Sequence, residues 1–355
     1  MARQVQFGRV RALMALLLLV LAATAAAGAW LYRDYQRFSH APLGVGTEPV
    51  VIDIARGTSF RGVVARLAAT HLDGGVHELY WRALAWEHGA RVQAGEYAIE
   101  ASMTPLSLLE KLGRGEVIQY RFTLVEGWSV HELRLALARD PVLVQTLAAV
   151  PEDELMAQLG VRADIDGDRD ETRPEGLFLP ETYQFTRGTT DAELLKRAHA
   201  ALVTALNTAW RDRAPDLPLA SPYEALVLAS IVEKETGLAS ERAQVAGVFL
   251  RRLRLGMRLQ TDPSVIYGLG PNFSGRLTRA HLEADTPHNT YTRDGLPPTP
   301  IALPGREAIQ ASLHPAAGDA LYFVARGDGP GHVFSRTLSE HNRAVAEYRR
   351  KVRQP

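Results

Sequence analysis

The sequence contains no cysteine, which excludes a disulfide framework, a thiolate nucleophile and any Cys-ligated zinc or iron–sulfur site. It also lacks a surplus of charge of either sign, because 40 Lys and Arg residues balance 40 Asp and Glu residues. Without a basic surplus no global field attracts nucleic acid, so we expect no nucleic-acid partner. Aromatic residues are few, at 7%, yet 46% hydrophobic and 23% charged residues are typical of a folded globular protein. The 355 residues allow about two or three domains.

One long hydrophobic run lies near the N-terminus. The segment from Ala12 to Tyr32 carries no charge and is long enough to cross about 30 Å of hydrocarbon as a helix. Arginines precede it, and Trp30 and Tyr32 stand where an interfacial aromatic belt is expected. The positive-inside rule therefore predicts a cytoplasmic tail (residues 1–11), a single transmembrane helix (12–32) in the inner membrane, and a body exported to the periplasm.

The alternative is a cleavable signal peptide, because the Ala-rich stretch 22–29 offers A-x-A-like cleavage sites. The hydrophobic region of a signal peptide is usually about 7 to 15 residues long. The run in this chain is longer, and it ends in aromatic residues rather than in a small-residue cleavage site. We therefore favour a retained anchor.

The exported body divides into three expected parts. Residues 33–48 have turn formers and little apolar periodicity, and predict a linker without a core. Residues 49–120 predict a small α/β subdomain, and residues 121–355 predict a larger α+β domain. The expected fold class is thus α+β, with an N-terminal transmembrane helix.

The sequence of the small subdomain predicts short strands and helices joined by Gly-containing turns. Thr104 and Pro105 are an N-cap and first-turn pair for its last helix, which Gly113 is expected to close. The strand–turn–helix pieces locally resemble LysM-type modules, which bind chitin-like or peptidoglycan glycans, and this implies a LysM-like glycan-binding role. The expected strands are 50–54 and 95–99, and the expected helices are 60–72, 79–86 and 106–112.

In the larger domain we expect a strand at 121–125, helices at 130–138 and 191–210, and a Pro-rich connector at 215–222. The acidic segment from Asp164 to Glu175 has oxygen ligands at calcium-loop spacing. However, it has Arg169 where an EF-hand needs Gly, and the alternative is a solvated acidic turn.

The most informative helix begins near Ser221. Ser221 as N-cap, Pro222 in the first turn and Glu224 at the third position form a capping-box pattern, and Gly237 is expected to end the helix. Residues 225–232 are apolar except for one serine, so this helix is expected to be buried on most sides.

Two carboxylates, Glu233 and Glu235, lie near the end of this helix. Helical spacing directs Glu235 towards the more apolar neighbours. Burial and the negative end of the helix dipole both disfavour a carboxylate, so Glu235 is the better candidate for a general acid. The alternative is a pair of ordinary charged residues in the last helical turn, paired with Lys234 or Arg242.

Segments rich in turn formers and hydrogen-bonding side chains follow this helix, and such loops commonly line a binding site. Side chains that could hold sugar hydroxyl or acetamido groups, or stack on a sugar, are Gln260, Thr261, Asp262, Tyr267, Asn289 and Tyr291. Asp262 and Asn289 could instead cap turns. The histidines are too scattered to suggest a metal site, and we expect no metal and no cofactor.

Several blocks of the sequence closely resemble the YceG-like family of endolytic murein transglycosylases, in order and in spacing. The longest is Ala229–Thr236 (ASIVEKET), followed by Arg258–Gly268 (RLQTDPSVIYG). Two departures stand out: His288 occupies a position where the family usually has Tyr, and Thr299 one where Gly is more common. The other matching blocks are residues 175–183, 289–291, 295–298, 314–315, 322–325, 331–334 and 341–342.

This resemblance implies that the second glutamate of the E-K-E-T block, Glu235, is catalytic. It implies cleavage of the β-1,4 bond between N-acetylmuramic acid and N-acetylglucosamine within a peptidoglycan glycan strand, leaving a 1,6-anhydro end. We expect the side chains named above, together with Glu233, to bind the substrate. By the same resemblance the enzyme terminates growing strands, works beside peptidoglycan synthases and remains attached to the inner membrane. The rival functions are a non-catalytic peptidoglycan-binding scaffold and a muramidase-type hydrolase.

Overall fold

A computed structural model describes residues 2–44, 46–70, 78–89, 91–161, 165 and 173–353. The chain separates into two compact units, Met1–Gln119 and Tyr120–Pro355, and each is described by itself. The expected division into domains, with the larger one starting at residue 121, stays a prediction. The mixed helix and strand content confirms the α+β class. Most of the expected calcium loop, including Asp164, lies outside the described residues.

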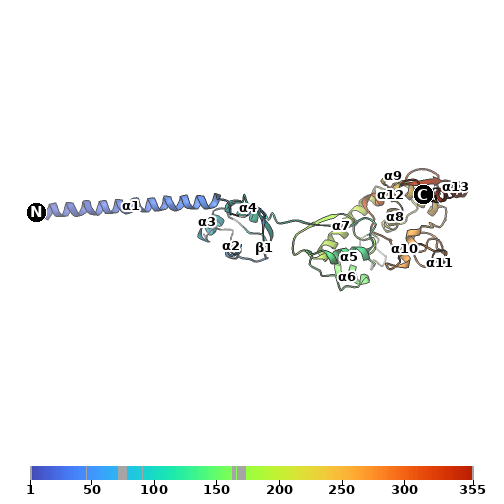
Figure 1. Ribbon diagram of the computed structural model, residues 1–355, viewed down its shortest axis with the longest axis horizontal. Helices are drawn as coiled ribbons and strands as arrows, with labels where there is room; N and C mark the ends of the chain where they lie inside the picture. Colours follow the sequence, from blue (N-terminus) through green and yellow to red (C-terminus); the bar gives the residue numbers. More distant parts are fainter. Residues whose placement is uncertain are drawn as a thin grey trace. The chain divides into compact units, whose positions relative to one another are not determined.

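The first unit consists of a long N-terminal helix and a small α/β body (Figure 1). Strands β1 and β2 pair antiparallel, with Ile52 opposite Tyr97. Two helices connect them, so the expected strand, helix, helix, strand order is confirmed. The elements are α1 (Ala2–His40), β1 (Val50–Ile54), α2 (Phe60–Ala69), α3 (Glu78–Glu87), β2 (Gly95–Ile99) and α4 (Pro105–Arg114).

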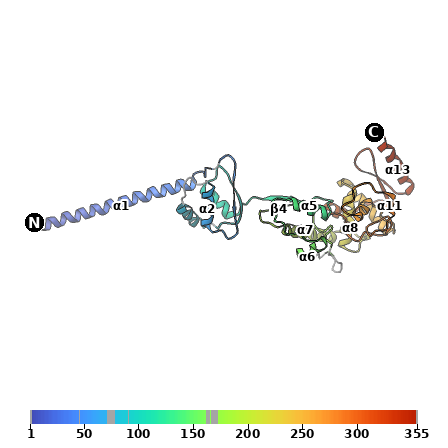
Figure 2. The same cartoon turned by 60° about the horizontal axis from the view of Figure 1, so that its bottom comes forward.

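Helix α1 is longer than the expected transmembrane segment, and its path is unbroken in Figure 2. In the described residues, the stretch Arg11–His40 is long and apolar enough to cross a membrane. The expected linker at 33–48 is wrong in its first half, because residues 33–40 continue the helix and Tyr35 and Phe38 pack against the core of the small body. Leu43 is also buried in that core. Periodicity missed these contacts because only one helical face is covered.

Helix α4 begins where the sequence predicted. Thr104 accepts a hydrogen bond from the backbone N–H of Ser107, and Pro105 follows it. The helix does not close at Gly113, which is helical, but at Gly115, whose φ of 68° is left-handed. A glycine tolerates that conformation without the steric cost of a Cβ.

The second unit contains the larger core. Its strands form two antiparallel pairs, β3 with β4 and β5 with β6. Its elements are β3 (Tyr120–Thr123), α5 (Val130–Arg139), the 3₁₀ turn η1 (Glu152–Glu154), α6 (Leu155–Leu159), β4 (Thr182–Phe185), α7 (Asp191–Arg211), α8 (Pro222–Glu235), α9 (Ala239–Arg254), α10 (Asp262–Leu269), α11 (Arg279–Glu283), α12 (Arg306–Leu313), β5 (Tyr322–Ala325), β6 (His332–Ser335) and α13 (Leu338–Arg353).

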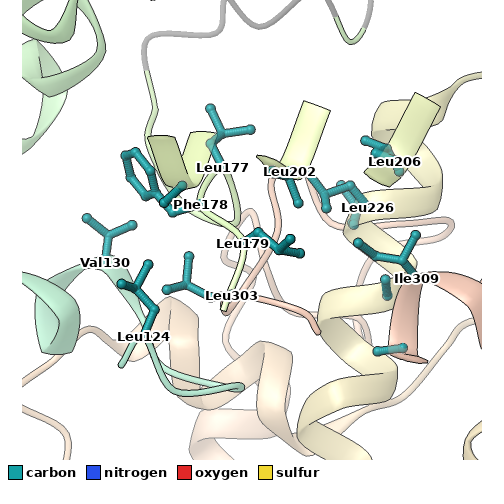
Figure 3. Packing of buried hydrophobic residues seen from close by; sticks show 14 of the residues in the cluster. Leu124, Val130, Leu177, Phe178, Leu179, Leu202, Leu206, Leu226, Leu303 and Ile309 are labelled. Atoms are coloured by element: carbon teal, nitrogen blue, oxygen red, sulfur yellow. The ribbon is translucent and has the colours of Figure 1, made fainter. Parts of the chain in front are cut away.

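Helices α7, α8, α9 and α12 pack together around the core. Figure 3 shows Leu202 and Leu206 of α7 close to Leu226 of α8 and Ile309 of α12. Every residue of α8 from Ala225 to Val232 is almost fully buried, as its sequence, apolar except for Ser230, predicts. Helix α8 is therefore the central element of the unit, and its C-terminal end is held in a fixed position.

Candidate active site around Glu235

The position of Glu235 follows from how α8 begins and ends. Ser221 caps the helix by accepting a hydrogen bond from Glu224 N–H, and Pro222 occupies the first turn. The return half of the expected capping box is absent, because the Glu224 carboxylate accepts from Ala220 N–H at 2.7 Å. The helix ends at Glu235, and the cap is extended Thr236 rather than Gly237. Glu235 is thus the last helical residue.

The carboxylate of Glu235 accepts a hydrogen bond at Oε1 from the hydroxyl of Thr261. Burial raises its pKa, the Thr261 hydrogen bond lowers it, nearby Asp262 raises it, and the electrostatic effects of His332 and Arg252 lower it. The net direction is upward, so the site favours the protonated acid more than water does. No salt bridge involves Glu235 in the described part of the chain. A neutral donor beside a carboxyl with a raised pKa makes that carboxyl a better general acid than an ordinary glutamate, and one that can also take a proton.

Thr261 is held by a buried hydroxyl network. Its backbone N–H donates to Oγ1 of Thr290 at 3.0 Å, and the Ser264 hydroxyl donates to its carbonyl at 2.8 Å. All three side chains are nearly inaccessible to water. The preceding residue, Gln260, has a left-handed φ of 50° and donates its N–H to the Thr290 carbonyl at 3.1 Å. The expected polar loop is therefore a rigid turn entering α10.

Glu233 has a different environment from Glu235. Its Oε2 accepts from Gly305 N–H at 2.9 Å, and its Oε1 lies 3.5 Å from Nη2 of Arg242. Its side chain is only 6% exposed, and burial raises its pKa while these contacts oppose the shift. Arg242 also contacts Glu126 and Glu307. Both oxygens of Glu233 are thus occupied inside the protein, and its substrate-binding role stays a prediction.

The remaining predicted binding residues fall into two groups. The hydroxyl of Tyr291 donates to Oδ1 of Asp262 at 2.6 Å, at the start of α10. Burial, together with the Asp262 charge, raises the pKa of Tyr291, which stays a neutral phenol. Asn289 is fully buried, and its amide donates to the carbonyls of residues 281, 282 and 284 while Oδ1 accepts from Tyr291 N–H. Asn289 therefore shapes the loop and has no accessible polar atom.

Tyr267 belongs to a buried cluster on the other side of α10. Its ring lies 4.9 Å from that of His288, centroid to centroid. His288 in turn shares a hydrogen bond of 2.9 Å with Thr299, so the two residues that depart from the family pattern contact each other. Burial lowers the pKa of His288 to about 4 and keeps the ring neutral.

Glu175 joins this cluster, although the sequence suggested it only as a calcium ligand. Its carboxylate is buried, and both oxygens accept from Val130 N–H, at 3.1 and 3.2 Å. Burial raises its pKa to about 8, while hydrogen bonds from Val130 and Tyr267 oppose the shift. A carboxyl with that pKa is largely protonated at neutral pH.

Two side chains near Glu235, those of His332 and Arg252, were missed from the sequence. His332 is held by Glu241, with 2.7 Å between Nδ1 and Oε2 and a further backbone hydrogen bond of 2.9 Å. Arg252 is buried, and its Nε and Nη1 donate to the carbonyls of Leu321 and Leu259 at 2.7 and 2.9 Å. No single motif contains these residues together with Glu235. Only the packing of α9 and the β5–β6 hairpin brings them close enough to lower the pKa of Glu235.

The fold and the site define an α+β protein with one carboxyl of raised pKa at the end of a buried helix. Comparison with known proteins agrees: the model of the YceG-like family matches residues 52–347, and the chain belongs to that family. It is 31% identical over 270 residues to an endolytic murein transglycosylase of Bacillus subtilis, covering 72% of this chain and 73% of the other.

Two further relatives extend the comparison. An endolytic murein transglycosylase of Streptococcus pneumoniae is 26% identical over 93% of this chain, which spans 64% of that protein's length. A crystal structure of a protein described as yceG-like, from Listeria monocytogenes, superimposes with a TM-score of 0.53 at 28% identity, covering 84% of this chain and 99% of the other. The likeness therefore includes both units.

Proposed function

We propose that this protein is an endolytic murein transglycosylase, a lyase that cuts the β-1,4 bond between N-acetylmuramic acid and N-acetylglucosamine inside peptidoglycan glycan strands. The observation that carries the proposal is Glu235, a partly exposed carboxyl at the end of a buried helix, with a pKa that desolvation raises and a single neutral hydrogen-bond donor. The curated relatives bear the name of this activity. No cofactor is needed for this chemistry.

The reaction needs one group that acts first as an acid and then as a base. Glu235 gives its proton to the glycosidic oxygen as the bond from that oxygen to C1 of the muramic acid breaks. It then takes the proton of the same sugar's 6-hydroxyl, whose oxygen bonds to C1. The products are a strand with a new 4-hydroxyl and a strand with a 1,6-anhydro end, and no water is consumed.

Glu235 suits this role better than Glu233 does. An ion pair with Arg242 and a backbone hydrogen bond hold the Glu233 carboxylate, and these contacts resist protonation. Thr261 is assigned to orient Glu235, and Gln260, Asp262 and Tyr291 to contact the sugar. Tyr267, Asn289 and Glu233 are assigned to support the walls of the site. The small first unit is proposed to bind glycan as a LysM-like module.

The rival hydrolase would use two carboxylates placed across the bond, one of which activates a water or attacks C1. Mass spectrometry of products from purified glycan strands separates the two reactions. Anhydro ends carry no added water, and hydrolytic ends carry one. Anhydro ends are the expected result, and a product set with only reducing ends would replace this proposal with muramidase activity. The absence of any cleavage would favour the non-catalytic scaffold.

The apolar N-terminal helix fits membrane anchoring. The proposed arrangement is a cytoplasmic tail, one span in the inner membrane and a periplasmic catalytic unit, following the arginines that precede the span. This location holds the enzyme beside newly made strands and the peptidoglycan synthases that make them. Protease protection of the N-terminal tail in sealed, right-side-out spheroplasts tests the orientation. Copurification with peptidoglycan synthases tests these partners.

A further inference from the structure

Helix α3 of the first unit carries an exposed apolar face. Leu79 is 76% exposed and Trp86 is 88% exposed. These residues are seven apart, which places them on one helical face about 10 Å apart at 1.5 Å per residue. Arg82 and Ala83 lie between them and are also exposed. Large apolar side chains at such exposure are unusual in water and mark an interaction surface when they gather on one face.

The other face of α3 is fixed to the end of α1. The Tyr35 and Tyr80 rings lie 5.7 Å apart, and the Phe38 and Trp81 rings lie 5.5 Å apart. Tyr35 donates its hydroxyl hydrogen bond to Glu87 at 2.5 Å. Because α1 continues as one helix through these contacts, α3 and α1 form a single rigid element.

This rigid link sets the distance of α3 from a bilayer spanned by α1. Tyr32 ends the uncharged run, and Tyr35 and Phe38 lie about 5 Å and about 9 Å beyond it along the helix axis. The headgroup region of one leaflet is about 5–8 Å thick. Helix α3 therefore packs at the height of the headgroups, and Figure 1 shows it on the side of the unit towards the N-terminal part of α1.

The charges around this position favour an anionic lipid surface. The acidic side chains at this junction face tyrosines, since Asp34 accepts from the Tyr80 hydroxyl at 2.8 Å and Glu87 accepts from Tyr35. The exposed arginines Arg33, Arg37 and Arg82 form no ion pair within the described part of the chain. Tryptophan beside arginine at a headgroup boundary is the usual composition of an interfacial helix.

We propose that the exposed face of α3, formed by Leu79, Arg82, Ala83 and Trp86, lies in the headgroup region of the leaflet from which α1 emerges. The face holds the small unit against the bilayer as a second, non-spanning membrane contact. It binds the lipid surface through buried apolar area and through attraction between Arg82 and anionic headgroups.

The absence of native cysteine permits a direct test with single-cysteine variants of the full chain. Leu79→Cys, Trp86→Cys, Val51→Cys and Val20→Cys are each labelled with a fluorescent probe and reconstituted in vesicles of phosphatidylcholine and phosphatidylglycerol. Val51 is the matched control, because it is 52% exposed on β1 of the same unit. Val20 reports insertion of α1 itself.

A lipid with a nitroxide on its headgroup is expected to quench the probes at positions 79 and 86 and to leave the probe at position 51 unaffected. Aqueous iodide is expected to quench the probe at position 51 more strongly than those at positions 79 and 86. Arg82→Glu is expected to reduce the quenching at 86. Equal lipid quenching at 86 and 51 would overturn the proposal. Shielding of position 86 that appears only when soluble glycan fragments are added would also overturn it and assign the face to glycan. An acyl-chain nitroxide that fails to quench position 20 would remove the anchor and the proposal together.

Discussion

The hydroxyl of Thr261 donates a hydrogen bond to Oε1 of Glu235. Thr261 is the N-cap residue of α10 and Glu235 is the last residue of α8, so this bond connects the two helices. This contact fixes the carboxylate in one orientation while leaving its other oxygen without a protein partner in the described residues. Because Thr261 is itself held by Thr290 and Ser264, the orientation depends on a network rather than on one side chain.

Replacing Thr261 with valine removes this hydroxyl and nearly preserves volume. We expect turnover to fall by about tenfold or more, because hydrogen bonds to charged groups contribute about 1.5–3 kcal/mol. The pKa of Glu235 should rise, since the Thr261 hydrogen bond lowers it. The pH profile of kcat on glycan strands measures both effects. Thr182→Val, at the exposed Thr123–Thr182 pair, is the control and should leave the profile unchanged.

His332→Gln tests the histidine near Glu235. The electrostatic effect of His332 lowers the pKa of Glu235, so replacing His332 should raise that pKa further. Because the general acid works in its protonated form, activity should persist to higher pH before it declines. Glu241→Gln, which loosens His332, should change the profile less. An alkaline limb that stays in place, or moves to lower pH, would show that His332 does not act on Glu235.

Glu175→Gln tests the buried cluster under α10. The pKa of Glu175 is raised in the folded state to about 8, above its usual value in an unfolded chain. The folded protein therefore holds a proton that the unfolded chain releases, and stability should fall as pH rises from about 4.5 to about 8. The glutamine variant should lose that part of the decline. Urea unfolding at a series of pH values measures it, with exposed Glu154→Gln as the reference. Parallel curves for wild type and Glu175→Gln would contradict the raised pKa.

Tyr291→Phe removes the phenol that bonds to Asp262 at 2.6 Å. If the pair contacts the sugar, KM should rise several-fold while kcat changes little, because binding in the ground state and the transition state is lost equally. A fall in thermal stability with unchanged KM would instead assign the pair to the loop alone. Steady-state kinetics and a melting curve on the same preparation separate these results.

The sequence predicted elements with strong local signals. Strand β1 and helix α4 begin where β-branched residues or a Thr-Pro pair indicate, and the apolar run of α8 predicted its burial correctly. The predicted positions of the helix ends were less accurate. Gly113 and Gly237 are ordinary helix stops by type, but the chain uses Gly115 and extended Thr236 instead, because tertiary contacts decide where the last turn ends.

The site was predictable only in part, for a similar reason. Glu235 was found because its helix carries a local pattern. The Thr261 contact, the Glu241–His332 pair and buried Arg252 depend on segments far apart in the chain, and no spacing rule reveals them. Asn289 looked like a sugar ligand by residue type, but backbone carbonyls of its own loop occupy its amide.

The most direct test of the central claim compares Glu235→Gln with Glu233→Gln on purified glycan strands, counting new 1,6-anhydro ends by mass spectrometry. Glutamine keeps the size of the side chain but supplies no acidic proton. We expect Glu235→Gln to lose activity by a factor of about 10² to 10⁴ with unchanged unfolding, since that is the usual contribution of a general acid. Glu233→Gln should retain turnover in proportion to its folded fraction. Equal release of anhydro ends by wild type and Glu235→Gln would contradict the proposed mechanism.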